Sequence, residues 1–345
     1  MNGSGLSGPS DCGLPRCAYA LSGGTIASCT RPCSSFFAAG CTGNTATSRA
    51  LPTPFTITAR YTAASLGLNH PDTLAIGPDG NLYVTDLSQR VTVISPAGTV
   101  LRRWGKPGTS PGQFRFIPAN PTVPTDVQGN VAIGPDGRVY VSDSGNARVQ
   151  VFTTQGRFIR QFGSFGSKKG QFLRPLSLAV DNAGDVYVGD DQAETLAKFS
   201  ASGNVIWTIG GSASSDPDLT GHFHFTSFDT HGRLVIVNDD QQRVLYVDQS
   251  GRKMDAFSPH FTTYFPTGEA CEATVDAAGD TFVSGCGPQP TGPTLVYDRA
   301  HGLIAKWPAK TYSLLRSPVF GPNGEVFALA TDGSILKLHI TLSGA

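Results

Sequence analysis

The chain has 345 residues, and its 26 Lys and Arg side chains balance 26 Asp and Glu side chains, so the formal net charge at pH 7 is zero. This balance argues against a general binder of polyanions, and no apolar run reaches the roughly 18 residues that a membrane-spanning helix needs. Hydrophobic residues make up 39% of the chain, while 41 Gly and 24 Pro residues favour a soluble fold with many turns over long helices.

The first 50 residues form a polar segment, rich in Gly and Ser, that holds five of the seven cysteines, namely Cys12, Cys17, Cys29, Cys33 and Cys41. Such a segment cannot build its own hydrophobic core, so we expect an irregular structure held by disulfides. A metal knuckle or reduced thiols are the alternatives, but the segment has no Cys-x-x-Cys pair, and no histidine comes before His70. Disulfides would place the chain in an extracellular, cell-surface or periplasmic compartment, reached through a leader or anchor outside this sequence.

A strand-like run, Phe55–Tyr61, comes next and is followed by six copies of one pattern. The clearest copies are residues 75–86, 132–143 and 179–190, and weaker copies are residues 227–238, 274–285 and 319–330. Their turn glycines, Gly80, Gly137, Gly184, Gly232, Gly279 and Gly324, are 57, 47, 48, 47 and 45 residues apart. A period of this length predicts one four-stranded blade for each copy.

The last copy contains only three predicted strands and ends near Ile340. We expect Phe55–Tyr61 to supply the missing fourth strand, which would close the ring and leave no exposed sheet edge. Residues 51–345 are therefore predicted to form an all-β, six-bladed β-propeller that is closed by an N-terminal strand.

The second copy continues as Asp-Ser-Gly-Asn-Ala-Arg-Val-Gln-Val-Phe at residues 143–152, and this run resembles the NHL repeat. The usual pattern of that family is an apolar strand, a turn ending in Gly, an aromatic-Val-x-Asp strand and then Gly-Asn-x-Arg. The resemblance covers about residues 55–342 and implies the six-bladed propeller of that family. Copies four to six depart from the pattern, because Asn238, Gly285 and Ala330 replace the Asp that ends the second strand. NHL propellers serve many purposes, so the resemblance alone assigns no function.

One face of such a ring should carry the short glycine turns, and the other should carry the longer and more variable loops. Extra residues at 115–130 and 287–292 fall on the second face, where binding functions concentrate. Counting back from the turn glycines places a set of polar residues at the channel mouth on that face, namely Asp72, Asn130, His224, Glu272 and Arg316. This set is a candidate ligand site, and the alternative is an ordinary polar lining with bound water.

Two enzyme classes with similar propellers remain as alternatives for the same mouth. Peptidyl-hydroxyglycine amidating lyases hold zinc through histidines that enter first strands of three blades, and only His224 matches such a position, so Asp72 or Glu272 would have to substitute. Gluconolactonase-like propellers hold a divalent cation such as Ca²⁺ through Glu, Asn and Asp side chains, for which Glu272, Asn130 and Asp72 have suitable chemistry. No Gly-x-Ser-x-Gly elbow or Walker-type phosphate loop is present.

The two remaining cysteines, Cys271 and Cys286, bracket the first predicted hairpin of blade five. Pairing Asp276 with Thr281 across the turn would set the two cysteines opposite each other, so we expect a cross-strand disulfide. Two buried thiols are the alternative.

The charges are unevenly spread, because residues 101–175 hold 11 Lys and Arg against 3 Asp and Glu, whereas residues 176–300 hold 6 against 17. Some NHL propellers bind RNA on a basic face, but few aromatic side chains accompany these cations and disulfides do not suit an RNA-handling compartment. A solvated flank or a docking patch for an acidic partner is favoured over nucleic acid. The leading hypothesis is a monomeric, non-catalytic, extracytoplasmic binding or sensor propeller that engages a ligand or protein through its loop-rich face.

Overall fold

The computed structural model divides the chain into two units, Met1–Pro52 and Thr53–Ala345. It describes residues 17–21, 25–29, 51–116, 129–212, 214–261, 269–286, 293–307, 318–322 and 324–342. Within these ranges no helix is long and apolar enough to cross a membrane.

The cysteine-rich segment contains one antiparallel strand pair, where only irregular structure is expected from the sequence. Strands β1 (Cys17–Leu21) and β2 (Thr25–Cys29) pair so that Cys17 lies opposite Cys29. The other three cysteines of the segment lie outside the described residues, and the disulfides of this segment stay a prediction.

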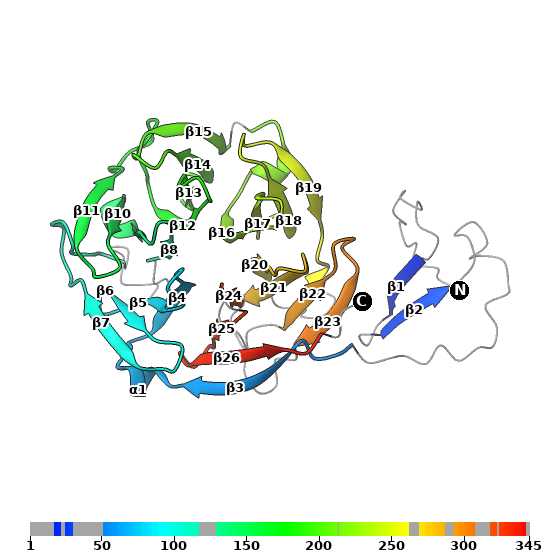
Figure 1. Ribbon diagram of the computed structural model, residues 1–345. Coiled ribbons are helices and arrows are strands. Elements are labelled where there is room, and N and C mark those ends of the chain that lie inside the picture. Colours follow the sequence, from blue (N-terminus) through cyan, green and yellow to red (C-terminus); the bar gives the residue numbers. More distant parts are fainter. Residues whose placement is uncertain are drawn as a thin grey trace. The chain divides into compact units, whose positions relative to one another are not determined.

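The second unit consists of six four-stranded antiparallel sheets arranged around a centre, which confirms the predicted six-bladed propeller (Figure 1). Blade one contains β4 (Pro71–Ile76), β5 (Leu82–Asp86), β6 (Arg90–Ile94) and β7 (Val100–Trp104). Blade two contains β8 (Val131–Ile133), β9 (Val139–Asp143), β10 (Arg148–Phe152) and β11 (Phe158–Phe162). Blade three contains β12 (Pro175–Val180), β13 (Val186–Asp190), β14 (Thr195–Phe199) and β15 (Val205–Gly210).

The next two blades repeat this meander. Blade four contains β16 (Phe223–Phe228), β17 (Leu234–Asn238), β18 (Arg243–Val247) and β19 (Lys253–Phe257). Blade five contains β20 (Glu269–Val275), β21 (Thr281–Cys286), β22 (Thr294–Tyr297) and β23 (Leu303–Trp307). Short 3-10 helices at Ser144–Asn146 and Pro217–Leu219 lie in the connections.

Blade six is built from both ends of the unit, as the sequence predicts. Strands β24 (Val319–Phe320), β25 (Val326–Leu329) and β26 (Ile335–Ile340) are completed by β3 (Phe55–Tyr61), which pairs with β26. The short helix α1 (Ala63–Leu66) then leads into blade one. Because β3 covers the last strand, the ring closes without an unpaired edge at β26.

The hydrophobic core is divided among the contacts between blades. Six clusters of buried side chains each join two neighbouring blades, and one of them brings Tyr83 of blade one against Val139 and Val141 of blade two. The second strands are buried along their whole length in blades one to four. Their Val, Ile, Leu and Tyr residues suit a strand that is covered on both faces.

An aromatic residue from the fourth strand of one blade packs against the turn between the third and fourth strands of the next. A Cβ atom added at Gly98 would lie 2.2 Å from Tyr61, and one added at Gly156 would lie 2.6 Å from Trp104. Both glycines have positive φ, at 80° and 82°. Glycine is therefore needed at these turns both for the backbone conformation and for the close approach of the ring.

His301 replaces this glycine in blade five. It has φ of 63° and stacks on Phe257, with ring centroids 4.3 Å apart and planes 15° apart, and it also stacks on Tyr246 at 5.8 Å. Burial lowers the pKa of His301 below its ordinary value, and the neighbouring Asp255 and Asp298 only partly offset this. The neutral imidazole is thus the form that the blade contact favours.

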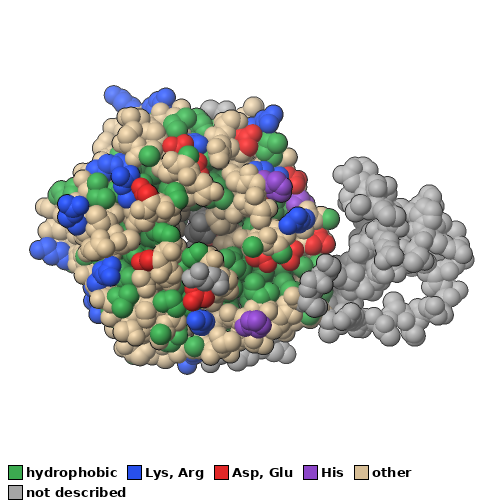
Figure 2. Space-filling view, in the orientation of Figure 1, with side chains coloured by type: hydrophobic (Ala, Val, Ile, Leu, Met, Phe, Trp, Pro, Cys, Tyr) green, Lys and Arg blue, Asp and Glu red, His purple; other side chains and the backbone are tan. Residues whose placement is uncertain are grey.

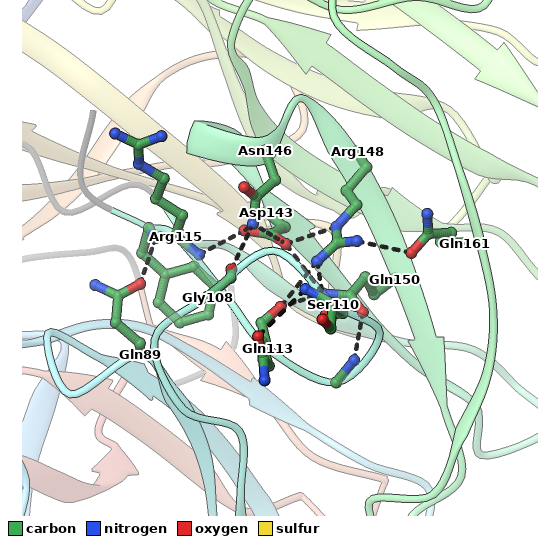
Figure 3. Close-up of polar contacts among 12 residues, drawn as sticks. Gln89, Gly108, Ser110, Gln113, Arg115, Asp143, Asn146, Arg148, Gln150 and Gln161 are labelled. Carbon is green, nitrogen blue, oxygen red and sulfur yellow. Dashed lines mark hydrogen bonds and ion pairs between the residues drawn. The ribbon is translucent and has the colours of Figure 1, made fainter. Parts of the chain in front are cut away.

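The carboxylate that ends the second strand binds the connection that enters the blade. Asp143 accepts hydrogen bonds from the Arg115 backbone N–H at 2.7 Å, Arg148 Nε at 2.8 Å and Gln150 Nε2 at 3.0 Å (Figure 3). Asp190 likewise accepts from the backbone N–H groups of Leu173 and Arg174, at 2.7 and 2.9 Å. The aspartate of the repeat is therefore a structural residue that fixes the loops of one face.

The departures from the repeat have local explanations in blades four and five. Asn238 replaces the aspartate where the connection offers carbonyls, and its Nδ2 donates to the Asp218 and Thr220 carbonyls at 2.9 and 2.7 Å. At Gly285 an added Cβ would lie 2.1 Å from the ring of Phe261, so the aromatic side chain occupies the space of the missing carboxylate.

We predict that Asp143→Ala destabilises the protein by about 3–5 kcal/mol, because it leaves the Arg148 guanidinium, which is 6% exposed, without its partner. Asp136→Ala is the matched control, since its ion pair with Arg138 is 45% exposed on both sides and should contribute about 1 kcal/mol or less. Urea unfolding of both variants measures the difference. Equal losses of unfolding free energy in the two variants would show that the buried Asp143 contacts stabilise the protein no more than an exposed ion pair does.

We predict that His301→Phe reduces the loss of stability between about pH 7.5 and about pH 5, because Phe keeps the stack and cannot be protonated. Since the pKa of His301 is lowered on folding, the unfolded chain binds more protons in this range and the wild type loses stability as pH falls. Urea unfolding at several pH values tests this. His231→Gln, at a side chain that is 69% exposed, is the control and should keep the wild-type pH dependence.

Candidate functional site

The innermost strand of every blade lines the centre of the ring (Figure 1). Four residues of the candidate channel mouth lie in or next to such strands: Asp72 in β4, Asn130 just before β8, His224 in β16 and Glu272 in the middle of β20. The fifth, Arg316, lies outside the described residues.

These four residues are largely buried. Asp72 and Asn130 are each 7% exposed and Glu272 is 6% exposed, while the His224 side chain is 19% exposed. In the part of the chain that the structure describes, neither Asp72 nor Glu272 belongs to a set of three His, Cys, Asp or Glu side chains close enough to hold a metal ion. Asn130 Oδ1 is buried and accepts no hydrogen bond from the described residues. The four described positions thus lie in or beside the inner strands of four blades, and Asp72, His224 and Glu272 do not form one compact set of metal ligands.

The first strands are irregular at these positions. The pairing register shifts between Pro71 and Thr73 and between Pro175 and Ser177, so Asp72 and Leu176 are the extra residues of two bulges. A bulge bends the strand and redirects a side chain, so equivalent counts from the turn glycines need not give side chains that point the same way.

A series of hydroxyl groups connects the inner parts of successive blades, and the sequence analysis did not find it. Each hydroxyl donates to a carbonyl at the inner strand of the next blade: Thr73 to Gly129 at 3.1 Å, Ser142 to Leu176 at 3.0 Å, Ser177 to Phe223 at 3.0 Å, Ser227 to Ala273 at 3.4 Å and Thr274 to Pro318 at 2.7 Å. These bonds connect the inner parts of successive blades directly. The sequence feature that could have predicted these bonds is a Ser or Thr in the first or second strand of most repeats.

The hairpin of blade five differs in register from the prediction. Val275, not Asp276, pairs with Thr281, and a shift between Ala270 and Glu272 leaves Cys271 as a bulge residue, so Glu269 lies opposite Cys286. The prediction of directly opposed cysteines was wrong because it assumed a regular ladder. Cys271 is nevertheless disulfide-bonded. The Cys286 side chain lies outside the described part, so the pairing of these two cysteines stays a prediction.

His224 faces a carboxylate of its own blade instead of a partner across the channel. Its Nε2 lies 3.3 Å from Asp239 Oδ2, and His222 Nδ1 lies 2.9 Å from Asp240 Oδ2. Burial raises the pKa of Asp239, but the hydrogen bond and charge of His224 outweigh it, so the pKa lies below its ordinary value. Burial lowers the pKa of His222, and Asp191, Asp240 and Asp239 outweigh that effect and raise it.

Two loops that connect successive blades on the loop-rich face have the same sequence pattern and the same bridge. Residues 105–114 and 163–172 both read Gly-x-x-Gly-x-x-x-Gly-Gln-Phe, and each closes with a parallel bridge, Pro107 to Phe114 and Phe165 to Phe172. We call the exposed residues Lys106, Phe165, Lys168 and Lys169 of these connections, together with the adjoining Arg115, the basic patch. Phe165 is 74% exposed, which is unusual for a large apolar side chain.

A pocket of about 650 Å³ adjoins the basic patch. Lys168, Lys169, Asp190 and Trp207 are among the residues that line it. This volume lies in the range of small-molecule and side-chain binding sites. Figure 2 shows Lys and Arg side chains along the edge that carries β7 and β11, and Asp and Glu side chains over blades four and five.

Comparison with known proteins connects the second blade to a described repeat. Residues 130–152 match the model of the NHL repeat. "Protein brain tumor" of Drosophila melanogaster is 26% identical over 185 residues, which are 51% of this chain and 16% of that protein. "Peptidyl-glycine alpha-amidating monooxygenase" of Mus musculus is 38% identical over 122 residues, which are 32% of this chain and 11% of that protein. "NHL repeat-containing protein 3" of Mus musculus is 25% identical over 202 residues, which are 55% of each chain.

Solved structures with low sequence identity share the fold. A putative gluconolactonase has a TM-score of 0.57 at 12% identity, covering 84% of this chain and 94% of its own. Virginiamycin B lyase from Staphylococcus aureus has a TM-score of 0.54 at 13% identity, covering 83% and 99%. These likenesses concern the propeller alone.

Proposed function

This chain is a six-bladed β-propeller that carries NHL repeats, and we propose that it is a non-catalytic binding protein of an extracytoplasmic compartment. Its partner is an acidic protein, and the binding surface is the basic patch on the loop-rich face together with the pocket beside Trp207. The observation that carries this proposal is the contrast between the buried residues of the inner strands and the exposed cations and Phe165 of the two repeated connections.

The inner strands support a structural role. Their hydroxyl groups bind carbonyls of the next blade, and the equivalent bulge positions hold an aspartate in blade one, Leu176 in blade three and a disulfide-bonded Cys271 in blade five. A zinc lyase needs several imidazoles around one open position, and Leu176 cannot act as a ligand.

The basic patch supports binding of an acidic partner. Lys106, Arg115, Lys168 and Lys169 are exposed on neighbouring connections, and in Figure 3 the Arg115 side chain extends away from the polar network that its backbone joins. Exposed cations attract an acidic partner over a distance, while Phe165 offers apolar area at the centre of a contact. Asp143 and Asp190 hold both connections in place, so the surface is formed before binding.

The disulfide bond at Cys271 supports the proposed extracytoplasmic location, because disulfides persist mainly in secreted, cell-surface and periplasmic proteins.

A metal-dependent lyase or lactonase is the second candidate function. It is favoured by the similarity to an amidating monooxygenase over 122 residues and by Asn130 Oδ1, which is buried without a hydrogen-bond donor among the described residues. Its site would lie at the channel mouth, where Asp72, His224 and Glu272 would have to move closer together than they lie in this structure to hold a divalent cation such as Zn²⁺ or Ca²⁺.

We predict that the protein binds a peptide of alternating Glu and Ser residues, and that Lys168→Glu with Lys169→Glu weakens this binding at least about tenfold through charge reversal. The binding should also weaken as salt is added, because exposed charges are screened. Fluorescence anisotropy of the labelled peptide measures both effects.

The control variant, Arg138→Glu with Arg157→Glu, makes the same charge change on turns of the opposite face and should leave peptide affinity within about twofold. Equal effects of the two double variants would refute the basic patch as the binding surface. Tighter binding of a single-stranded RNA oligonucleotide than of the peptide would refute the acidic protein partner.

A further inference from the structure

A cluster of potential metal ligands lies at the open end of the first hairpin of blade four, on the side away from its glycine turn. His222 precedes β16, and Asp239 and Asp240 follow β17, so the antiparallel pairing of these strands brings the three side chains together. One ligand atom from each residue can be chosen so that all three lie within 4.8 Å of one another. The cluster is separate from the basic patch, which lies on the connections before blades two and three.

The backbone holds His222 close to Asp240. Asp240 Oδ2 accepts a hydrogen bond from the His222 backbone N–H at 3.0 Å, and the His222 imidazole Nδ1 lies 2.9 Å from the same oxygen. The preceding Gly221 has φ of 99°, and a Cβ atom there would lie 2.3 Å from Asp240 Oδ2. Glycine therefore permits an approach that any other residue would block.

Asp239 has one oxygen that the described residues leave without a partner. Its Oδ2 lies 3.3 Å from His224 Nε2, whereas Oδ1 is buried and accepts no hydrogen bond from the described residues. A buried carboxylate oxygen is normally bonded, so a water molecule or a cation is expected at Oδ1. His224 fixes the orientation of this carboxylate, as outer hydrogen-bond partners do in metal sites.

We propose that His222, Asp239 and Asp240 bind one Zn²⁺ ion at the open end of the β16–β17 hairpin, with His224 as a positioning residue that contacts Asp239. One imidazole and two carboxylates form a ligand set that suits Zn²⁺ and leaves a coordination position open. Ca²⁺ requires six to eight oxygen ligands and fits this set poorly. The ion would lie at the open end of the β16–β17 hairpin, beside the channel-mouth residue His224, whereas Asp72 and Glu272 do not belong to the set.

The test is isothermal titration of the chelator-treated full chain with ZnCl₂, with CaCl₂ as the comparison. We expect one saturable Zn²⁺ site, and His222→Ala or Asp239→Asn should weaken it at least about tenfold. His231→Ala is the matched control, because His231 and Asp229 form a similar pair in the same blade, 3.5 Å apart, and should not affect binding. Thermal unfolding without metal establishes that each variant is folded.

Zn²⁺ affinities of two His224 variants test its positioning role separately. His224→Ala should weaken Zn²⁺ binding by about 10- to 100-fold, whereas His224→Gln, which can still donate to Asp239, should retain most of the affinity. Equal losses in both variants would contradict the positioning role.

Substitution with Co²⁺ distinguishes this site from binding by cysteines elsewhere in the chain, since thiolate ligands add a strong near-ultraviolet absorption. Absence of saturable Zn²⁺ binding, binding unaffected by His222→Ala and Asp239→Asn, or a thiolate spectrum would overturn the proposal.

Discussion

The hydrogen bonds between the carboxylate at the end of a second strand and the connection entering the same blade hold the loop-rich face in shape. Asp143 and Asp190 each bind backbone amides of that connection, and Asp143 also neutralises the buried Arg148. The connection that carries Lys168 is thereby anchored at its end, at Leu173 and Arg174. A buried carboxylate is stable in this position because its oxygens find several donors.

The hydrophobic core of this propeller is divided among the contacts between neighbouring blades. Each blade therefore needs a neighbour on both sides, and the ring must close. Each hydrophobic cluster belongs to two blades, so a single blade cannot bury its second strand alone. Strand β3 completes blade six and places Phe55 against Phe282 and Trp307 of blade five. Hydroxyl-to-carbonyl bonds connect neighbouring blades near the centre, and they use polar groups that would otherwise be available to a ligand.

The period of the turn glycines predicts the blades and the closing strand, because one glycine turn recurs in each blade. The same count places Asp72 and Glu272 in first strands. It does not predict that they are buried, since the spacing of glycines does not reveal a bulge or a bond to the next blade. The register at Cys271 was missed for this reason. His222 and Asp240 are 18 positions apart, and only the pairing of β16 with β17 brings them together. The repeated Gly-Gln-Phe connections were visible in the sequence and could have been found.

If the chain binds a partner without catalysis, its channel residues serve the fold and no substrate turns over at the channel mouth. The most direct test is an assay of the purified protein for peptidyl-hydroxyglycine cleavage and for lactone hydrolysis, with Zn²⁺ or Ca²⁺ added. No turnover above a metal-only blank is predicted for either substrate. Metal-dependent turnover that Glu272→Gln abolishes in a folded variant would contradict the account and place a catalytic site at the channel mouth.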